Sequence, residues 1–492
     1  MKKLSKSKFL SGTQCEKKLW YDYNRTDLKQ PVNERTQAVF DLGHRIGILA
    51  QEMFPNGKDA TPEDYSNLKP SIDKTQQWIA ENEQTIYEAT FSTDNAFCML
   101  DILHQENGEL WAIEVKSSTG VKDYHITDAS LQYYVMKKNG VVPDKFFLMH
   151  INNQYVKIGE ITSELFTLTD ITDFVIENQG WVEENLYRLQ EMLKSKTEPK
   201  IEIGNQCNSP FSCEYQYHCW KHVPENSVFE LYRGGHKGWE LYEQKVLKLE
   251  DIPDDFPLTH FQTLQRNSLK NNEKYFNKEA VKNEISHWEF PLYFFDFETV
   301  FPAIPIIDGT RPYQQVPFQY SLHIMTKNGN ISHKEFLANP EDFSNAKNPL
   351  QQMVDQLKQD FGTKGNIVTY NCGFEIMVLN MLAEHCASDA DFLHQLVSRV
   401  VDLLPVFRGG HCYFPVMKNS ASIKYVLPAI APEFTYQNLE IQEGGTASDL
   451  YLQSIENKGF VETTLSRNLL KYCERDTEAM VIIYQFLINK IY

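Results

Sequence analysis

The sequence lacks any long run of apolar residues. No window approaches the roughly eighteen consecutive apolar side chains that a transmembrane helix needs. The first residues, MKKLSKSKFLSG, are basic but lack the apolar stretch of a secretory signal. We therefore expect a soluble, cytoplasmic protein without a membrane partner.

Basic residues are in the minority. The chain has 48 Lys and Arg against 66 Asp and Glu, and its formal net charge is −18. This balance excludes a generally basic surface, so any binding of nucleic acid must be local and assisted by metal ions. The length of 492 residues favours about three domains, and a hydrophobic content of 42% is enough to fill their cores.

Cysteine is also sparse, with nine in the chain. In a cytoplasmic protein they are more often free or metal-bound than paired. Cys207, Cys213 and Cys219 follow one another at even spacing in CNSPFSCEYQYHC, and a tetrahedral sulfur site of this kind normally has a fourth ligand. Five others stand singly in apolar or mixed surroundings and are expected to be ordinary buried thiols: Cys98, Cys372, Cys386, Cys412 and Cys473.

The hydrophobic pattern predicts an α/β fold in three parts. Helical spacing up to about Phe54 is followed by predicted strands at 85–91, 96–105 and 110–118, a helix at 126–140 and a strand at 144–151. A long helix is predicted at 173–195. Residues 289–492 predict three strands and then alternating helices and strands, typical of a mixed α/β domain. We expect domains at 1–225 and 289–492, joined by a charged helical connector at 226–288.

The first candidate site is a D…ExK pattern on two adjacent strands. Glu114 and Lys116 point to the same face because they lie two residues apart, and Asp101 ends the preceding strand. Two carboxylates hold Mg²⁺ or Mn²⁺ against a phosphate, and a lysine beside them orients water and offsets charge. An exposed ion pair on a hairpin is the commoner explanation of this pattern alone.

The neighbouring helices give this pattern a family context. His44 lies in a predicted helix upstream and Gln132 in one downstream. This order resembles the RecB-like branch of the PD-(D/E)XK nucleases. The resemblance implies a restriction-endonuclease-like α/β domain, with His44 as an additional metal ligand and Gln132 as support for the site.

The same resemblance supplies a fourth cysteine. RecB-like nucleases with an iron–sulfur cluster carry one cysteine before the nuclease core and three after it, which here are Cys15 and then Cys207, Cys213 and Cys219. These four, which we name the cysteine clasp, are implied to hold a structural [4Fe–4S] cluster. Zinc is the alternative, because four thiolates also suit it and two histidines, His218 and His222, are near.

A second candidate site begins in the strand YFFDFET, where Asp296 and Glu298 face the same way. Burying two like charges together is costly unless a cation shares them. Glu375 lies early in a later helix. Tyr472 and Asp476, four residues apart, share one face of the last helix.

This second pattern resembles the DnaQ-like (DEDD) 3′–5′ exonucleases of the RNase H fold. The resemblance implies that Asp296, Glu298, Glu375 and Asp476 hold two Mg²⁺ or Mn²⁺ ions and that Tyr472 orients the attacking water. Glu375 departs from the family, which normally has Asp there. Two further residues have open roles: Asp402 as a supporting acid or a helix cap, and Lys424 as a phosphate contact or an exposed lysine.

The whole chain resembles an uncharacterised bacterial family that fuses these two domains. The resemblance implies a metal-dependent nuclease acting on DNA, exonucleolytic on single-stranded ends, with two separate active sites. One alternative is a single RecB-like site with a C-terminal domain that only binds nucleic acid, and another is an exonuclease that processes RNA. The sequence lacks a G-x-x-x-x-G-K-[ST] loop, so ATP-driven unwinding would need a helicase or another repair or defence partner.

Overall fold

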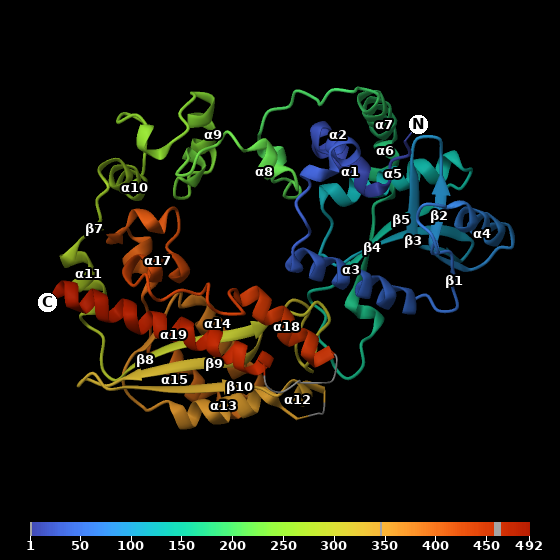
Figure 1. Ribbon diagram of the computed structural model, residues 1–492. Helices are drawn as coiled ribbons and strands as arrows, with labels where there is room; N and C mark the ends of the chain where they lie inside the picture. The colour runs from blue at the N-terminus through green and yellow to red at the C-terminus, as the bar shows by residue number, and fades with distance from the viewer. Residues whose placement is uncertain (1, 345–346, 457–463) are drawn as a thin grey trace. The chain divides into compact units, whose positions relative to one another are not determined.

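The computed structural model describes residues 2–344, 347–456 and 464–492, and it has the mixed α/β fold that the sequence predicts (Figure 1). Two compact units are present. Unit 1 comprises Met1–His222 with Ala303–Tyr313, and unit 2 comprises Val223–Pro302 with Gln314–Tyr492. The expected connector at 226–288 thus falls within unit 2. Among the described helices, none combines the length and the apolar character needed to cross a bilayer.

Unit 1 is built on a six-stranded sheet in which the strands follow chain order. The pairs β1–β2 and β4–β5 are parallel and the others are antiparallel. The strands are β1 (Lys58–Asp59), β2 (Thr85–Ser92), β3 (Phe97–Glu106), β4 (Glu109–Lys116), β5 (Lys145–Ile151) and β6 (Phe166–Asp170). The helices are α1 (Lys6–Gln14), α2 (Glu16–Asn24), α3 (Glu34–Glu52), α4 (Lys69–Ala80), α5 (Asp123–Lys138), α6 (Thr172–Glu177), α7 (Gln179–Leu193) and α8 (Gln216–Cys219).

The predicted strands and the hairpin between β3 and β4 are confirmed. Asn107 and Gly108 turn the chain with φ of 51° and 85°, which is the backbone that a tight two-residue hairpin requires. This turn fixes the register in which Ile102 pairs with Ile113. The single helix expected at 173–195 is instead two helices, α6 and α7, which meet at Asn178.

Two hydrophobic clusters cover the two faces of this sheet. One joins α1, α5 and α7 to the sheet and includes Phe9, Leu131 and Leu186. The other packs Ile46 and Ala50 of α3 against the opposite face. The site residues of β3 and β4 therefore lie between helices, in a sheet that is covered on both sides.

Unit 2 is built on a five-stranded mixed sheet in the order β10-β9-β8-β11-β12. The first three strands along the chain pair antiparallel, and β11 and β12 run parallel to β8. These strands are β8 (Leu292–Val300), β9 (Val316–Met325), β10 (Ile331–Leu337), β11 (Ile367–Thr369) and β12 (Val400–Asp402), and a separate pair is formed by β7 (Tyr275–Phe276) and β13 (Cys412–Tyr413).

The long C-terminal helix α19 (Thr464–Ile491) packs on β8 and β9 (Figure 1). Its buried side chains include Tyr472, Asp476 and Met480. The pattern predicted for residues 289–492, three strands followed by alternating helices and strands, is confirmed. The other helices of unit 2 are α9 (His236–Glu243), α10 (His260–Asn271), α11 (Lys278–Ile285), α12 (Pro340–Ser344), α13 (Pro349–Asp360), α14 (Gly373–His385), α15 (Ala390–Val397), α16 (Leu404–Arg408), α17 (Ile423–Ile430) and α18 (Gly444–Glu456).

Candidate metal-dependent active sites

Three acidic residues form a row across the sheet of unit 1. The pairing of neighbouring residues in the sheet places Glu88 of β2 opposite Asp101 of β3. In the same way, it places Asp101 opposite Glu114 of β4. Asp101 accepts a hydrogen bond of 2.6 Å from the backbone N–H of Val115. Burial and the charge of Glu114 raise the pKa of Asp101 to about 7. We call these three carboxylates, with Lys116, the N-terminal carboxylate site.

Two lysines neutralise Glu114. The Lys116 ammonium lies 2.7 Å from Glu114 Oε1 and 2.8 Å from Asp128 Oδ2, and Lys6 Nζ lies 2.9 Å from the same Glu114 oxygen. Burial alone would raise the pKa of Glu114, but the charges of Lys116 and Lys6 overcome it and hold that pKa well below its usual range. Glu114 is therefore ionised although it is buried.

Gln132 lies where the sequence pattern requires it. It is fully buried on α5 and donates a hydrogen bond of 2.7 Å from Nε2 to Glu114 Oε2. Its Oε1, like Asp128 Oδ1, is buried without a hydrogen-bond partner among the described residues. Two polar atoms beside Glu114 thus remain able to accept a proton or a cation.

His44 does not join these residues. It lies exposed on α3, whose buried face is formed by Ile46 and Ala50. In the described part of the chain, the groups of three close metal-ligating atoms do not include His44, Asp101 or Glu114. The role of His44 as a ligand remains a prediction from the resemblance.

Sequence reasoning missed Glu88 of this site and two of its ion-pair partners, Lys6 and Asp128. Burial and the charge of Asp101 raise the pKa of Glu88 to about 8. Strand register was the available signal for Glu88, since it is the acid in TIYEATF that falls opposite Asp101. No pattern in the sequence links Lys6 to a strand more than a hundred residues later, because that contact depends on how α1 packs.

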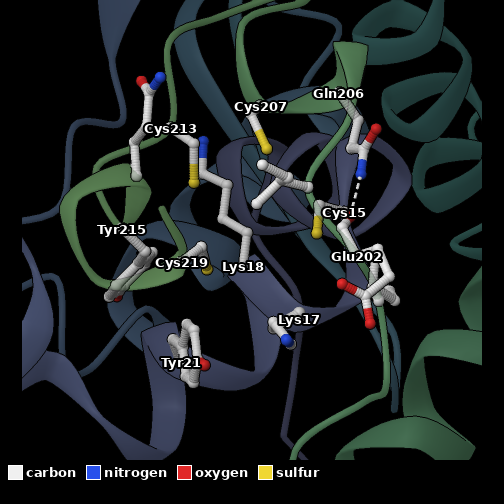
Figure 2. Close-up of a pocket in the computed structure, with 13 residues that line it drawn as sticks. Cys15, Lys17, Lys18, Tyr21, Glu202, Gln206, Cys207, Cys213, Tyr215 and Cys219 are labelled. Carbon is white, nitrogen blue, oxygen red and sulfur yellow. Dashed lines mark hydrogen bonds between the residues drawn. The ribbon is translucent and has the colours of Figure 1, made fainter. Parts of the chain in front are cut away.

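The four residues of the cysteine clasp line one pocket in unit 1 (Figure 2). Cys15 stands between α1 and α2, and Cys219 ends α8. Gln14 fastens the two segments, because its Nε2 donates to the carbonyls of Gln206 and Phe211 at 2.7 Å each. All four cysteines are free thiols, and Lys17 and Lys18 line the same pocket. The structure thus brings together residues that are up to 204 positions apart in the sequence.

A second group of four acids comes together in unit 2. Asp296 and Glu298 lie on β8, Glu375 in the first turn of α14 and Asp476 on α19. We call them the C-terminal carboxylate site. Burial and the charges of neighbouring acids raise the pKa of Glu298 to about 8 and that of Glu375 to about 8. The pKa of Asp296 is raised well above its usual range for the same reasons. Burial raises the pKa of Asp476 to about 6, although the hydrogen bond from Tyr436 and the charge of Lys424 oppose it.

Two buried oxygen atoms in and beside these acids lack a hydrogen-bond partner among the described residues. In the described chain, none of the four carboxylates forms an ion pair with a basic side chain. Glu375 Oε2 is buried without a hydrogen-bond partner, as is Gln319 Oε1, whose residue pairs with Glu298 across the sheet. Ligand atoms of Asp296, Glu298 and Cys473 lie within 4.8 Å of one another. Oxygen atoms with surplus negative charge and few donors are what a hard divalent cation requires.

Aromatic hydroxyls and a lysine border the C-terminal carboxylate site. Tyr436 donates a hydrogen bond of 2.5 Å to Asp476 Oδ1. Lys424 Nζ lies 5.2 Å from the ring centroid of Tyr472 and 5.4 Å from that of Tyr436, and its charge lowers the pKa of Glu298. Lys424 is therefore part of the site and not an isolated surface lysine. Tyr436 was missed, because no fixed spacing connects it to the acids.

The structure shows the surroundings of two further residues that the sequence analysis named. Asp402 caps helices: its carboxylate accepts hydrogen bonds from the backbone N–H groups of Asn371 and Cys372 near the start of α14, and from that of Leu404. Cys473 is buried as expected, but its sulfur lies 3.8 Å from Asp296 Oδ2, so its environment is the acidic site itself.

Comparison with known proteins gives relatives without an assigned activity. Residues 293–422 match a protein family described as a domain of unknown function, DUF2779. The chain is 27% identical over 212 residues to the uncharacterized protein MG366 homolog of Mycoplasma pneumoniae, covering 39% of this chain and 32% of that protein. It is 29% identical over 247 residues to the uncharacterized protein MG366 of Mycoplasma genitalium, covering 44% and 35%. The matched part spans about a third of the length of these curated relatives.

Proposed function

We propose that this protein is a metal-dependent nuclease that hydrolyses phosphodiester bonds in DNA, trimming single-stranded ends at two separate sites. The C-terminal carboxylate site would remove nucleotides from 3′ ends, and the N-terminal carboxylate site would cleave independently. Both roles rest on the sequence resemblances and on the geometry of the two acid groups.

The observation that carries the proposal is the convergence of Asp296, Glu298, Glu375 and Asp476. These carboxylates come from β8, α14 and α19. Folding brings these like charges together, which costs several kcal/mol for each uncompensated ion. Packing of the four side chains in the core does not offset this cost. A site that binds cations gives this arrangement a function.

The donor set of the C-terminal site fits Mg²⁺ or Mn²⁺. All four ligand side chains offer oxygen, and the buried Oε2 of Glu375 has no other partner in the described chain. When bound, such ions would activate water and stabilise the leaving 3′ oxygen of the cleaved strand. Glu375 has a longer side chain than the Asp that the resemblance leads us to expect, but it lies in the same group of acids as Asp476. The charge of Asp476 raises the pKa of Glu375.

Residues around these acids would position the reactants. The Tyr472 hydroxyl would orient the attacking water, as the resemblance implies. Lys424, beside the Tyr472 ring, would attract the phosphate and offset its charge. Tyr436 would hold Asp476 in place through its 2.5 Å hydrogen bond.

In unit 1, Asp101 and Glu114 would hold the metal, with Glu88 as a third carboxylate in the same row. Lys116 would orient water and offset negative charge at phosphorus. Gln132 would fix the Glu114 carboxylate through its 2.7 Å hydrogen bond. We add Glu88 because strand register places it opposite Asp101, whereas His44 lies exposed.

The cysteine clasp would hold a structural [4Fe–4S] cluster. Four thiolates at about 2.3 Å around one zinc ion stand about 3.8 Å apart. Among the described residues, the groups of three ligand atoms within 4.8 Å include no cysteine of the clasp. Zinc is the alternative occupant, and iron and sulfide analysis of anaerobically purified protein separates the two.

Degradation of single-stranded DNA labelled at either end tests the proposal. The full chain is compared with Lys116→Ala and with Asp296→Asn in Mg²⁺ or Mn²⁺. We expect each substitution to remove a different set of products. If Asp296→Asn changes no product from DNA or from labelled RNA, unit 2 binds nucleic acid without cutting it. If neither substitution affects hydrolysis, the proposal is wrong.

A further inference from the structure

Three ligand atoms come together in unit 2 outside the carboxylate sites. A ring nitrogen of His323, a ring nitrogen of His333 and a carboxylate oxygen of Glu474 lie within 4.8 Å of one another. The histidines are direct cross-strand partners on β9 and β10, and Glu474 projects from α19. His323 is buried, whereas His333 and Glu474 are partly exposed. The group is thus accessible from solvent and anchored in the sheet.

A chain of hydroxyl groups holds the two imidazoles. His323 Nδ1 lies 2.8 Å from Thr477 Oγ1, and His333 Nε2 lies 2.9 Å from Ser321 Oγ. The two hydroxyls are 2.7 Å apart. Thr477 also donates to the backbone carbonyl of Glu474 at 3.0 Å. Because a carbonyl oxygen can only accept, every hydrogen bond in this series of side chains donates in the direction of the Glu474 carbonyl.

This direction fixes the protonation of both rings. The Thr477 hydroxyl donates its proton to the carbonyl of Glu474, so it accepts hydrogen bonds from His323 Nδ1–H and from the Ser321 hydroxyl. Ser321 in turn accepts a hydrogen bond from His333 Nε2–H. The remaining lone pairs are on Nε2 of His323 and Nδ1 of His333. Histidines that bind metals usually donate their other N–H to such a partner, which sets the ring orientation.

The lone pair of His333 meets a second acceptor. Its Nδ1 lies 3.8 Å from Glu474 Oε1, and two acceptors facing each other repel unless a cation stands between them. A proton on His333 or a metal ion satisfies this contact. Ligands of a tetrahedral zinc ion at about 2.0–2.1 Å stand about 3.4 Å apart, so small side-chain shifts complete the geometry.

We propose that His323, His333 and Glu474 bind a zinc ion that fastens α19 to β9 and β10. Two imidazoles and one carboxylate suit zinc, and three protein ligands leave a fourth position for water. Glu474 lies between Tyr472 and Asp476 on α19. The ion would therefore hold the helix that carries these two residues in its register on the sheet.

Titration of the full chain with Co²⁺ tests this site without relying on nuclease activity. Excess Mg²⁺ occupies the carboxylate sites, and Co²⁺ bound by the cysteine clasp is recognised by its thiolate-to-metal charge transfer. The remaining visible absorption reports Co²⁺ bound to nitrogen and oxygen. We expect one such ion, displaced by Zn²⁺, in the wild type and none in Glu474→Gln or His333→Gln. Thr477→Val should weaken binding by about 10–100-fold, because it removes the hydroxyl that orients His323, and Thr477→Ser should restore it.

The matched control is Glu478→Gln, one turn further along α19. Glu478 pairs with Arg475 at 3.1 Å and has no part in the cluster, so this variant should bind like the wild type. Circular dichroism checks that each variant is folded, and elemental analysis counts zinc per chain. Equal absorption from nitrogen- and oxygen-bound Co²⁺ in the wild type, Glu474→Gln and His333→Gln would overturn the proposal.

Discussion

The two carboxylate sites bury acids in opposite electrostatic surroundings. In unit 1, Glu114 contacts two lysines, and its pKa lies below the usual range. In unit 2, Glu298 and Glu375 have no ion pair in the described chain, and burial among other acids raises the pKa of each to about 8. Glu114 therefore has its own cations, whereas the acids of the second site, like Asp101 and Glu88 in the first, hold protons or need ions from outside.

This difference has a thermodynamic consequence. Removing the lysine partner of a buried carboxylate destabilises the fold, because it leaves a buried charge without compensation. Buried like charges instead destabilise the fold, and removing one of them relieves repulsion. Substitutions of similar size should therefore shift stability in opposite directions at the two sites.

Replacing Asp296 should have the largest effect. Asp296→Asn removes a metal ligand, and we expect 3′ trimming to slow by about 100-fold or more, since charge stabilisation by a bound metal is worth several kcal/mol. In EDTA the same variant should melt at a higher temperature than the wild type. Thermal melting with and without Mn²⁺ measures both the relief of repulsion and the loss of the metal response.

Asp360→Asn is the matched control for this variant. Asp360 is also a buried acid of unit 2, but it accepts a hydrogen bond of 2.6 Å from Tyr320 and does not belong to the carboxylate site. It should lower the melting temperature and keep the response to Mn²⁺. An Asp296→Asn protein that melts lower than the wild type in EDTA would contradict the repulsion argument.

Removing Lys116 should destabilise unit 1. Lys116→Met leaves Asp128 without its cation and Glu114 with Lys6 alone, at a cost of about 3 kcal/mol. Cleavage by the N-terminal site should also disappear. Lys145→Met, which breaks an exposed pair with Asp170 on the same sheet, should cost less than about 1 kcal/mol. Equal losses in urea unfolding would show that Lys116 behaves as a surface residue.

The acids with raised pKa values and Glu114 should respond to pH in opposite senses. The pKa values of Glu298 and Glu375 rise from 4.5 to about 8 on folding, so the folded state binds more protons between these values. Stability in EDTA should therefore fall as pH rises from 4.5 to about 8. The raised pKa values of Asp101 and Glu88 in unit 1 act in the same sense. The lowered pKa of Glu114 acts in the other sense, because its contribution is present above 4.5 and is lost on acidification.

Melting curves across this pH range, with EDTA or with Mn²⁺, separate the two contributions. Mn²⁺ should flatten the decline towards pH 8, since metal binding replaces the protons of Glu298 and Glu375. Asp296→Asn should reduce it in EDTA only by the share of Asp296 itself, because burial and Asp476 still raise the pKa values of Glu298 and Glu375. A decline of the same size under all three conditions would place its origin outside the C-terminal carboxylate site.

The elements of both sheets follow from sequence, because periodicity and turn residues are local signals. The Asn107–Gly108 hairpin and the acids of YFFDFET were predicted from neighbouring residues, and the structure places them on the expected strands. The four cysteines of the clasp were brought together by family resemblance, since no local rule connects Cys15 with Cys207.

Contacts made by packing were not predictable in this way. Lys6, Tyr436 and the pair His323–His333 reach their partners only when helices settle on sheets or strands find their register. The single helix expected at 173–195 shows the same limit, because its break at Asn178 has no proline or glycine signal at that residue. Local patterns thus identify the acids of a site better than the cations and hydroxyls around them.

The smallest expected change in stability is at Gln132, where two effects oppose each other. Gln132→Met removes a hydrogen bond to the charged Glu114, worth about 1.5–3 kcal/mol, and also removes the buried Oε1 that has no partner in the described chain, which costs about 1–3 kcal/mol. Unfolding free energy should change by less than about 1 kcal/mol. Cleavage by the N-terminal site should nevertheless fall, because the Glu114 carboxylate loses the donor that orients it. Urea unfolding and DNA cleavage, measured on the same preparation, distinguish this positioning role from a structural one, in which stability and cleavage would be lost together.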